Sequence, residues 1–257
     1  MYPKSETDFS WSYLTQILRR VPQPCCLIGG WSVYLTVNQA FEKKTGRSYV
    51  GSRDIDLGFH FDPNWSQKEV KSSPFSMAVK EIEAMGFEPQ GSRFVKQYHH
   101  SQKRELTQEE KRHLPSYEIF NLYIDILVDS DDPKRFKKAG FNVMEEPLLN
   151  GVFAGKERAE TKLDGISVLM PAPQLLMKMK IKSFPSRTQD DKKTKDLVDL
   201  GALLLFSGYK PPTLESKERV ASYLRELSNT TNEEWKVIAD NLDVSVSAAQ
   251  RWLKLIR

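Results

Sequence analysis

The sequence predicts an α+β protein, in which strands and helices share residues 1–170 and helices make up residues 171–257. Runs rich in β-branched and aromatic residues predict strands at 25–28, 54–61, 93–99 and 117–128. From Pro173 onward, apolar residues recur at helical spacing instead. We therefore place one domain boundary near Pro171.

Helices are also expected inside the first domain. Apolar residues at helical spacing predict them over 9–20, 31–41 and 75–85. The charge-dense stretch 101–113 lacks such a pattern, so we expect a loop or a short exposed helix there.

Composition indicates an ordinary protein with a mild basic excess. Of its residues, 28% are charged and 39% are hydrophobic, and the formal net charge is +4. This balance is compatible with an anionic partner without requiring one. The sequence contains no signal peptide and no span of about twenty apolar residues, so we expect a cytoplasmic protein with no membrane partner. Cys25 and Cys26, the only cysteines, are adjacent, which favours apolar packing over a disulfide or a zinc site.

A glycine pair, Gly29-Gly30, follows the apolar residues Leu27 and Ile28 and precedes a segment of helical character. Glycine lets the backbone approach a ligand closely, and free N–H groups at the start of a helix favour an anion. We therefore expect this pair to lie against a phosphate group.

Two carboxylates, Asp54 and Asp56, are one residue apart in the strand predicted over 54–61. Side chains alternate along a strand, so both carboxylates should point to the same face. Neighbouring carboxylates repel each other unless a cation lies between them. Mg²⁺ is the natural cation, because it binds one or two carboxylates together with substrate phosphates.

A third carboxylate, Asp125, interrupts the most apolar strand of the sequence, residues 122–127. A charge at the centre of such a strand is costly unless it is paired or bound to a metal. We expect Asp125 to complete a two-metal site with Asp54 and Asp56. The competing interpretation is a buried aspartate that is satisfied by backbone groups or by an arginine.

These motifs resemble the nucleotidyltransferase superfamily with the DNA polymerase beta-type catalytic fold. The resemblance rests on Gly29-Gly30, on Ser52 to Leu57 and on Tyr123 to Leu127. The helical part is similar to the AbiEii-type toxin nucleotidyltransferases at Leu175-Leu176, Lys180, Ser183, Arg187 and Lys195 to Leu200. Two segments depart from the family pattern. The gap from Trp31 to Arg53 is longer than usual, and residues 62–116 match poorly.

The resemblance implies a mixed sheet with helices packed on it, followed by a helical C-terminal domain. Asp54, Asp56 and Asp125 would be the catalytic residues and would bind Mg²⁺ or Mn²⁺. The resemblance also implies a set of nucleotide-binding residues: Gly29, Gly30, Ser52, Arg53, Lys180 and Arg187. Asp125 would in addition help to activate the acceptor hydroxyl. For Lys180 and for the cluster from Lys195 to Asp199, the alternatives are a solvated helix face and an ion-pair network.

Residues 233–257 predict two short helices joined by a turn at Val244-Ser245. In the second helix we expect Ala248, Trp252 and Leu255 to point inward. The segment resembles a helix-turn-helix, in which exposed polar side chains would face nucleic acid. The expected set is Ser247, Gln250, Arg251 and Lys254. Asp243 stands where that motif usually has glycine, and a helical hairpin that only packs on the body explains the same pattern.

The sequence thus predicts an enzyme: a Mg²⁺-dependent nucleotidyltransferase that moves a nucleoside monophosphate from an NTP to an acceptor hydroxyl. The AbiEii-like resemblance implies a toxin-like activity on RNA, tRNA especially, or on a protein, with an antitoxin as a possible partner. One alternative is a small-molecule acceptor of the antibiotic type. The other is a non-catalytic nucleic-acid-binding regulator on the same fold.

Overall fold

The computed structural model describes residues 2–130, 143–212 and 216–256. The chain divides into two compact units. We call them the sheet unit, Tyr2–Trp31 with Gly51–Met170, and the helical unit, Ser32–Val50 with the chain from Pro171 onward. Residues 32–50 therefore belong with the C-terminal helices, whereas the sequence interpretation assigned everything up to residue 170 to one domain. The cause is hydrophobic packing, because one buried apolar cluster joins the C-terminal helices to Val33, Val37, Phe41 and Tyr49.

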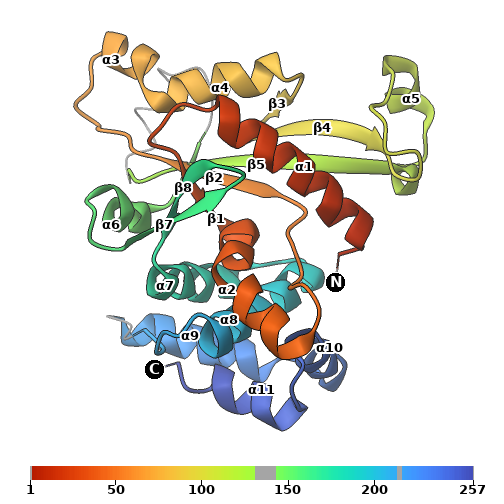
Figure 1. Cartoon of the computed structure of the whole chain (residues 1–257), viewed down its shortest axis with the longest axis vertical. Coiled ribbons are helices and arrows are strands. Elements are labelled where there is room, and N and C mark those ends of the chain that lie inside the picture. Colours follow the sequence, from red (N-terminus) through yellow and green to blue (C-terminus); the bar gives the residue numbers. More distant parts are fainter. Residues whose placement is uncertain (1, 131–142, 213–215, 257) are drawn as a thin grey trace. The chain divides into compact units, whose positions relative to one another are not determined.

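The described residues of the sheet unit contain one mixed sheet of eight strands (Figure 1). Their bounds are β1 Cys26–Ile28, β2 Ile55–Phe59, β3 Glu88–Gln90, β4 Arg93–His99, β5 Ile119–Val128, β6 Met144–Glu145, β7 Arg158–Leu163 and β8 Ile166–Pro171. The strand order is β3-β4-β5-β2-β1-β8-β7, and β6 pairs with β5. Strand β5 is parallel to β2 and antiparallel to β4, so the predicted mixed sheet is confirmed.

Aromatic side chains hold the first helix against the sheet. The centroid of the Phe9 ring on α1 lies 4.2 Å from the ring centroid of Tyr98 on β4 and 5.9 Å from that of Phe120 on β5. Helix α1 accordingly crosses β4 and β5 in Figure 1. The helices of this unit are α1 Lys4–Arg20, α3 Gln67–Ser72, α4 Pro74–Ala84, α5 Gln108–His113 and α6 Asn150–Phe153. The charge-dense stretch 101–113 therefore ends in a short helix, α5, whose residues are not buried.

Cys25 and Cys26 are buried and free, as expected for apolar packing. Burial raises the pKa of both thiols, and the adjacent Cys25 raises that of Cys26 further. The thiols are therefore protonated and unreactive, because the thiolate is the nucleophilic form.

The helical unit is organised around α8, Asp190–Phe206, which is buried along most of its length from Thr194 to Phe206. Neighbouring helices cover α8 on several sides, so its buried charged residues need partners inside the unit. These neighbours include α7 Pro173–Ser183, α10 Asn232–Leu242 and α11 Val246–Leu253. Helix α9, Lys217–Ser228, and most of α2, Gly29–Thr45, complete the unit. No helix in the described part of the chain combines the length and apolar character needed to span a bilayer.

The C-terminal segment forms two helices joined by a tight turn, α10 and α11. Asp243 takes the left-handed conformation that ends α10, with φ of 56°, and the Ser245 side chain accepts a hydrogen bond from the first turn of α11. The expected inward face of α11 was wrong by one position. Ala249, Leu253 and Ile256 are buried, whereas Trp252 is 37% exposed and Leu255 is 41% exposed. Apolar residues occupy adjacent positions along α11, so periodicity alone did not distinguish its two faces.

Candidate active site

The sheet unit places two of the three predicted carboxylates side by side. Asp56 on β2 and Asp125 on β5 are direct register partners in a parallel pair. Adjacent strands lie about 4.8 Å apart and register partners share a face, so these carboxylates are neighbours. Arg93 on β4 is in turn the register partner of Asp125 on its other side. Three consecutive strands thus present a row of Asp56, Asp125 and Arg93.

Arg93 pairs with the carboxylate of Asp125. Its Nη2 donates a hydrogen bond to Oδ2 at 2.9 Å, and its Nε lies 2.9 Å from Oδ1 in an ion pair. A hydrogen bond between charged groups is stronger than one between neutral groups. The Asp125 side chain is only 9% exposed, so the pair supplies the compensation that a buried charge requires. The arginine anticipated by the competing interpretation of Asp125 is therefore present.

Gly29 brings the start of α2 against the other carboxylate of the row. Its φ is +66°, and a Cβ built there would lie 2.7 Å from Cγ of Asp56. No residue with a side chain fits without displacing Asp56. Gly29 is the first residue of α2, so the Asp56 carboxylate lies beside the beginning of this helix. Both the conformation and the close approach explain why glycine occupies this position.

Asp54 departs from the sequence expectation. Strand β2 begins at Ile55, and Asp54 lies in the bend before it. The cause is the extent of pairing: β1 reaches only as far as Asp56, and β5 only as far as Ile55. Strand alternation therefore does not fix the direction of the Asp54 side chain relative to Asp56.

The remaining predicted phosphate-binding residues of this unit occupy different surroundings. Gly30 follows Gly29 in the first turn of α2, and Ser52 is buried ahead of β2. Arg53 turns toward α1: its guanidinium stacks over the Tyr2 ring at 5.0 Å and lies 3.5 Å from Glu6. The contacts of Arg53 are thus with the N-terminal segment.

The row Asp56–Asp125 has the chemistry of a site for a hard cation. Among the residues that the structure describes, no three His, Cys, Asp or Glu side chains are grouped to hold a metal ion. Mg²⁺ needs only one or two carboxylates when substrate phosphates supply further oxygens. The donor set therefore fits a single ion that a bound nucleotide would complete.

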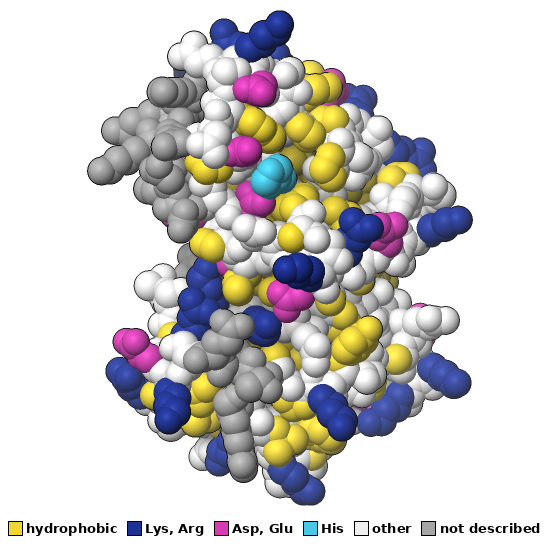
Figure 2. All heavy atoms as spheres, turned by 90° about the vertical axis from the view of Figure 1, so that its left-hand side faces the viewer, with side chains coloured by type: hydrophobic (Ala, Val, Ile, Leu, Met, Phe, Trp, Pro, Cys, Tyr) yellow, Lys and Arg dark blue, Asp and Glu magenta, His cyan; other side chains and the backbone are white. Residues whose placement is uncertain are grey.

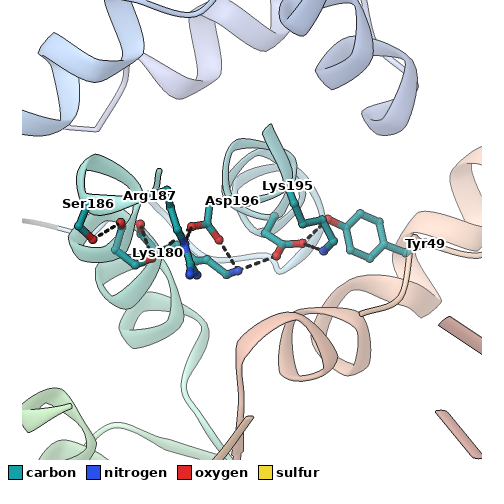
Figure 3. A network of polar contacts seen from close by, with 8 residues as sticks. Tyr49, Lys180, Ser186, Arg187, Lys195 and Asp196 are labelled. Carbon is teal, nitrogen blue, oxygen red and sulfur yellow. Dashed lines mark hydrogen bonds and ion pairs between the residues drawn. The ribbon is translucent and has the colours of Figure 1, made fainter. Parts of the chain in front are cut away.

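A second polar cluster lies inside the helical unit and joins α7, α8 and the residue Tyr49 (Figure 3). The ammonium group of Lys180 lies 2.6 Å from Asp196 and 2.8 Å from Asp199. Asp199, which is fully buried, also pairs with Lys195 and accepts a 2.7 Å hydrogen bond from the Tyr49 hydroxyl. We call this chain of contacts the buried ladder.

Mutual compensation keeps the charges of the buried ladder in place. Burial alone would raise the pKa of Asp199, but Lys180 and Lys195 outweigh it and hold this pKa below its ordinary value. Burial works against the charged form of Lys180 too, yet Asp196 and Asp199 raise its pKa overall. Burial prevails at Lys195, whose pKa is lowered. Burial, with Asp199 beside it, raises the pKa of the Tyr49 hydroxyl, which stays protonated and donates.

Lys180 and Arg187, both predicted to contact phosphates, belong to this cluster. Lys180 is engaged by two carboxylates, and the Arg187 Nε donates to Asp196 at 2.9 Å. The Arg187 side chain is 38% exposed, so it is the more accessible of the two cations. The ion-pair network weighed for residues Lys195 to Asp199 is therefore present.

Two residues of these clusters were missed from the sequence. Arg93 opens a predicted strand with the observed bounds, but nothing in the sequence paired that strand with Asp125. Tyr49 follows a turn and carries no motif. Both residues are identified only by their tertiary contacts, Arg93 with Asp125 and Tyr49 with Asp199.

No family model and no curated protein matches the sequence. One solved structure, an antigenic nucleotidyltransferase-like protein from Paracoccidioides brasiliensis, is similar, with a TM-score of 0.38 and 17% identity. The match covers 96% of this chain and 97% of the other. A similarity at this TM-score gives no information about function, which is therefore inferred from the geometry of the site.

Replacing Gly29 with alanine tests the contact with Asp56. Gly29→Ala combines a disfavoured φ with a clash against the carboxylate, whereas Gly91→Ala, also at φ +66°, meets open space. We expect Gly91→Ala to lose about 1–2 kcal/mol of unfolding free energy and Gly29→Ala to lose more. Urea titrations of both variants give the comparison. Equal losses would contradict the packing of Gly29 against Asp56.

Removing single members of the buried ladder tests its cohesion. Tyr49→Phe should cost about 1.5–3 kcal/mol, the usual value for a hydrogen bond to a charged group. Asp199→Asn should cost about 3–5 kcal/mol, because it leaves the buried ammonium group of Lys195 without its carboxylate partner. Urea titration measures both, with the half-exposed Tyr209→Phe as a control that should change nothing.

The lowered pKa of Asp199 also predicts an acid limit. Its contribution to stability is present above the unfolded-state value of about 3.9 and is lost as pH falls through the lower folded-state value. The asparagine variant should lack this component of the acid dependence. The same acid dependence in both proteins would contradict the assignment.

Proposed function

We propose that this protein is a nucleotidyltransferase that transfers a nucleoside monophosphate from an NTP to an acceptor hydroxyl with the help of Mg²⁺ or Mn²⁺. One observation carries the proposal: Asp56 and Asp125 are register partners on neighbouring strands, and the start of α2 at Gly29 packs against Asp56. Carboxylates for a hard cation therefore lie beside backbone groups suited to a phosphate. The resemblance of these motifs to the nucleotidyltransferase superfamily agrees with this chemistry.

In this proposal the chain's residues act mainly by positioning and charge. Asp56 and Asp125 would hold the cation, which neutralises triphosphate charge when it is bound. The N–H groups at Gly29 and Gly30 would bind phosphate oxygens. The acceptor oxygen forms a bond to the α-phosphorus as the bond to pyrophosphate breaks, and Asp125 would receive the acceptor's proton.

RNA is the acceptor that the distribution of charge favours. The helical unit holds 18 Lys and Arg against 12 Asp and Glu, whereas the sheet unit holds 20 against 22. The basic excess of the chain thus resides in the helical unit. Figure 2 shows Lys and Arg side chains spread over one face of the molecule. Such a surface attracts a polyanion. A protein acceptor, an antitoxin partner and a toxin-like role come from the family resemblance alone.

The C-terminal helices are a candidate nucleic-acid contact within the same proposal. Ser247 and Arg251 of α11 and Lys254 directly after it are exposed, and Gln250 is partly exposed. If the protein were a non-catalytic regulator, this surface would carry its binding.

A transfer assay tests the proposed activity. Each of the four α-³²P-labelled NTPs is incubated with Mg²⁺ and either total RNA or the protein alone. Wild type should label RNA, and Asp56→Asn should lower the rate at least about a hundredfold, the usual effect of losing a key electrostatic group. Asp164→Asn, in an exposed turn of the same unit, should retain the wild-type rate.

The other outcomes of this assay redirect the proposal. Label on protein alone would replace RNA by a protein acceptor. No label with any nucleotide would contradict transfer to macromolecules, leaving a small-molecule acceptor or the regulator. Equal labelling by Asp56→Asn and wild type would contradict the proposed site.

A further inference from the structure

Arg93 binds the carboxylate that the proposed reaction needs for its cation. The Nη2 group of Arg93 donates a hydrogen bond to Oδ2 of Asp125 at 2.9 Å, and Nε lies 2.9 Å from Oδ1 in an ion pair. A divalent ion approaching Asp125 must therefore share this carboxylate with a guanidinium group, which always carries a positive charge.

The position of Arg93 is fixed by more than the ion pair. Its backbone is the register partner of Asp125, and its guanidinium stacks over the ring of Tyr123, 4.7 Å from the centroid. Both Tyr123 and Asp125 belong to β5, so a single strand provides the stacking surface and the carboxylate. The Arg93 side chain remains 31% exposed, so a ligand can reach it from solvent.

We propose that Arg93 is a positioning residue that orients Asp125 and weakens the binding of a divalent cation until a nucleotide is present. This inference rests on the proposed function. The guanidinium holds the Asp125 carboxylate in one orientation beside Asp56. It also repels a second cation, since like charges a few ångströms apart raise each other's free energy. A triphosphate reverses the balance, because its oxygens supply ligands to the ion and an anionic partner to Arg93.

The affinity for Mn²⁺, measured by electron paramagnetic resonance without turnover, tests this role. In the absence of nucleotide, Arg93→Gln should bind Mn²⁺ at least about tenfold more tightly than wild type, because one nearby cation is gone. Arg104→Gln is the matched control, since Arg104 also pairs with a carboxylate, Glu110, but lies in an exposed loop of the same unit. Its Mn²⁺ affinity should equal that of wild type. A non-hydrolysable NTP analogue should tighten binding in wild type more than in Arg93→Gln.

Two further variants keep the test decisive if Arg93→Gln does not fold. Arg93→Lys retains the charge but cannot contact Asp125 through both Nε and Nη2, so its nucleotide-free Mn²⁺ affinity should be higher than that of wild type. The double variant Arg93→Gln with Asp125→Asn should bind Mn²⁺ more tightly than the single variant Asp125→Asn, because the double variant lacks the cation beside the site.

The outcomes separate this inference from the function on which it rests. Wild-type affinity in every folded Arg93 variant, with normal binding in the presence of nucleotide, would overturn the role of Arg93 alone. Failure of the wild-type protein to bind Mn²⁺ even with the NTP analogue would instead overturn the proposed function.

Discussion

The repulsion between two neighbouring carboxylates is the constraint on which the candidate site depends. Asp56 and Asp125 are register partners on neighbouring strands, so two acidic side chains share one face of the sheet. Like charges at such a spacing repel each other. Arg93, the register partner on the other side of Asp125, offsets part of this cost. Three neighbouring strands thus hold two carboxylates and one guanidinium group side by side. Because negative charge exceeds positive charge in this row, the site is suited to a ligand that brings a cation.

The helical unit solves a related problem in a different way. Asp199 is fully buried, and Lys180, Lys195 and the Tyr49 hydroxyl together compensate it. Breaking one member of such a set is costly because the remaining charges stay buried. Tyr49 comes from residues 32–50, so the buried ladder links this segment to α7 and α8. The ladder and the apolar cluster around Phe41 therefore explain together why the segment belongs to the helical unit.

Local patterns in the sequence predicted individual helices and strands better than they predicted which of these elements pack or pair with one another. The strand over 93–99 has the observed bounds of β4, and Asp125 does lie in a buried strand. What a single sequence did not contain is the pairing of β4 with β5, which brings Arg93 to Asp125. Tertiary contacts also decide which face of α11 is buried. This helix has apolar residues on two faces, and packing against α8 and α10 buries one of them. The extent of β1 and β5 likewise leaves Asp54 outside β2.

The central claim is that Asp56 and Asp125 form one cation and nucleotide site with the start of α2. Anomalous diffraction from crystals grown with Mn²⁺ and a non-hydrolysable NTP analogue tests it most directly, because it places the ion without reference to activity. The account predicts a manganese peak in contact with both carboxylates and the phosphates over Gly29 and Gly30. A nucleotide and its ion bound elsewhere, with Asp56 uninvolved, would contradict it.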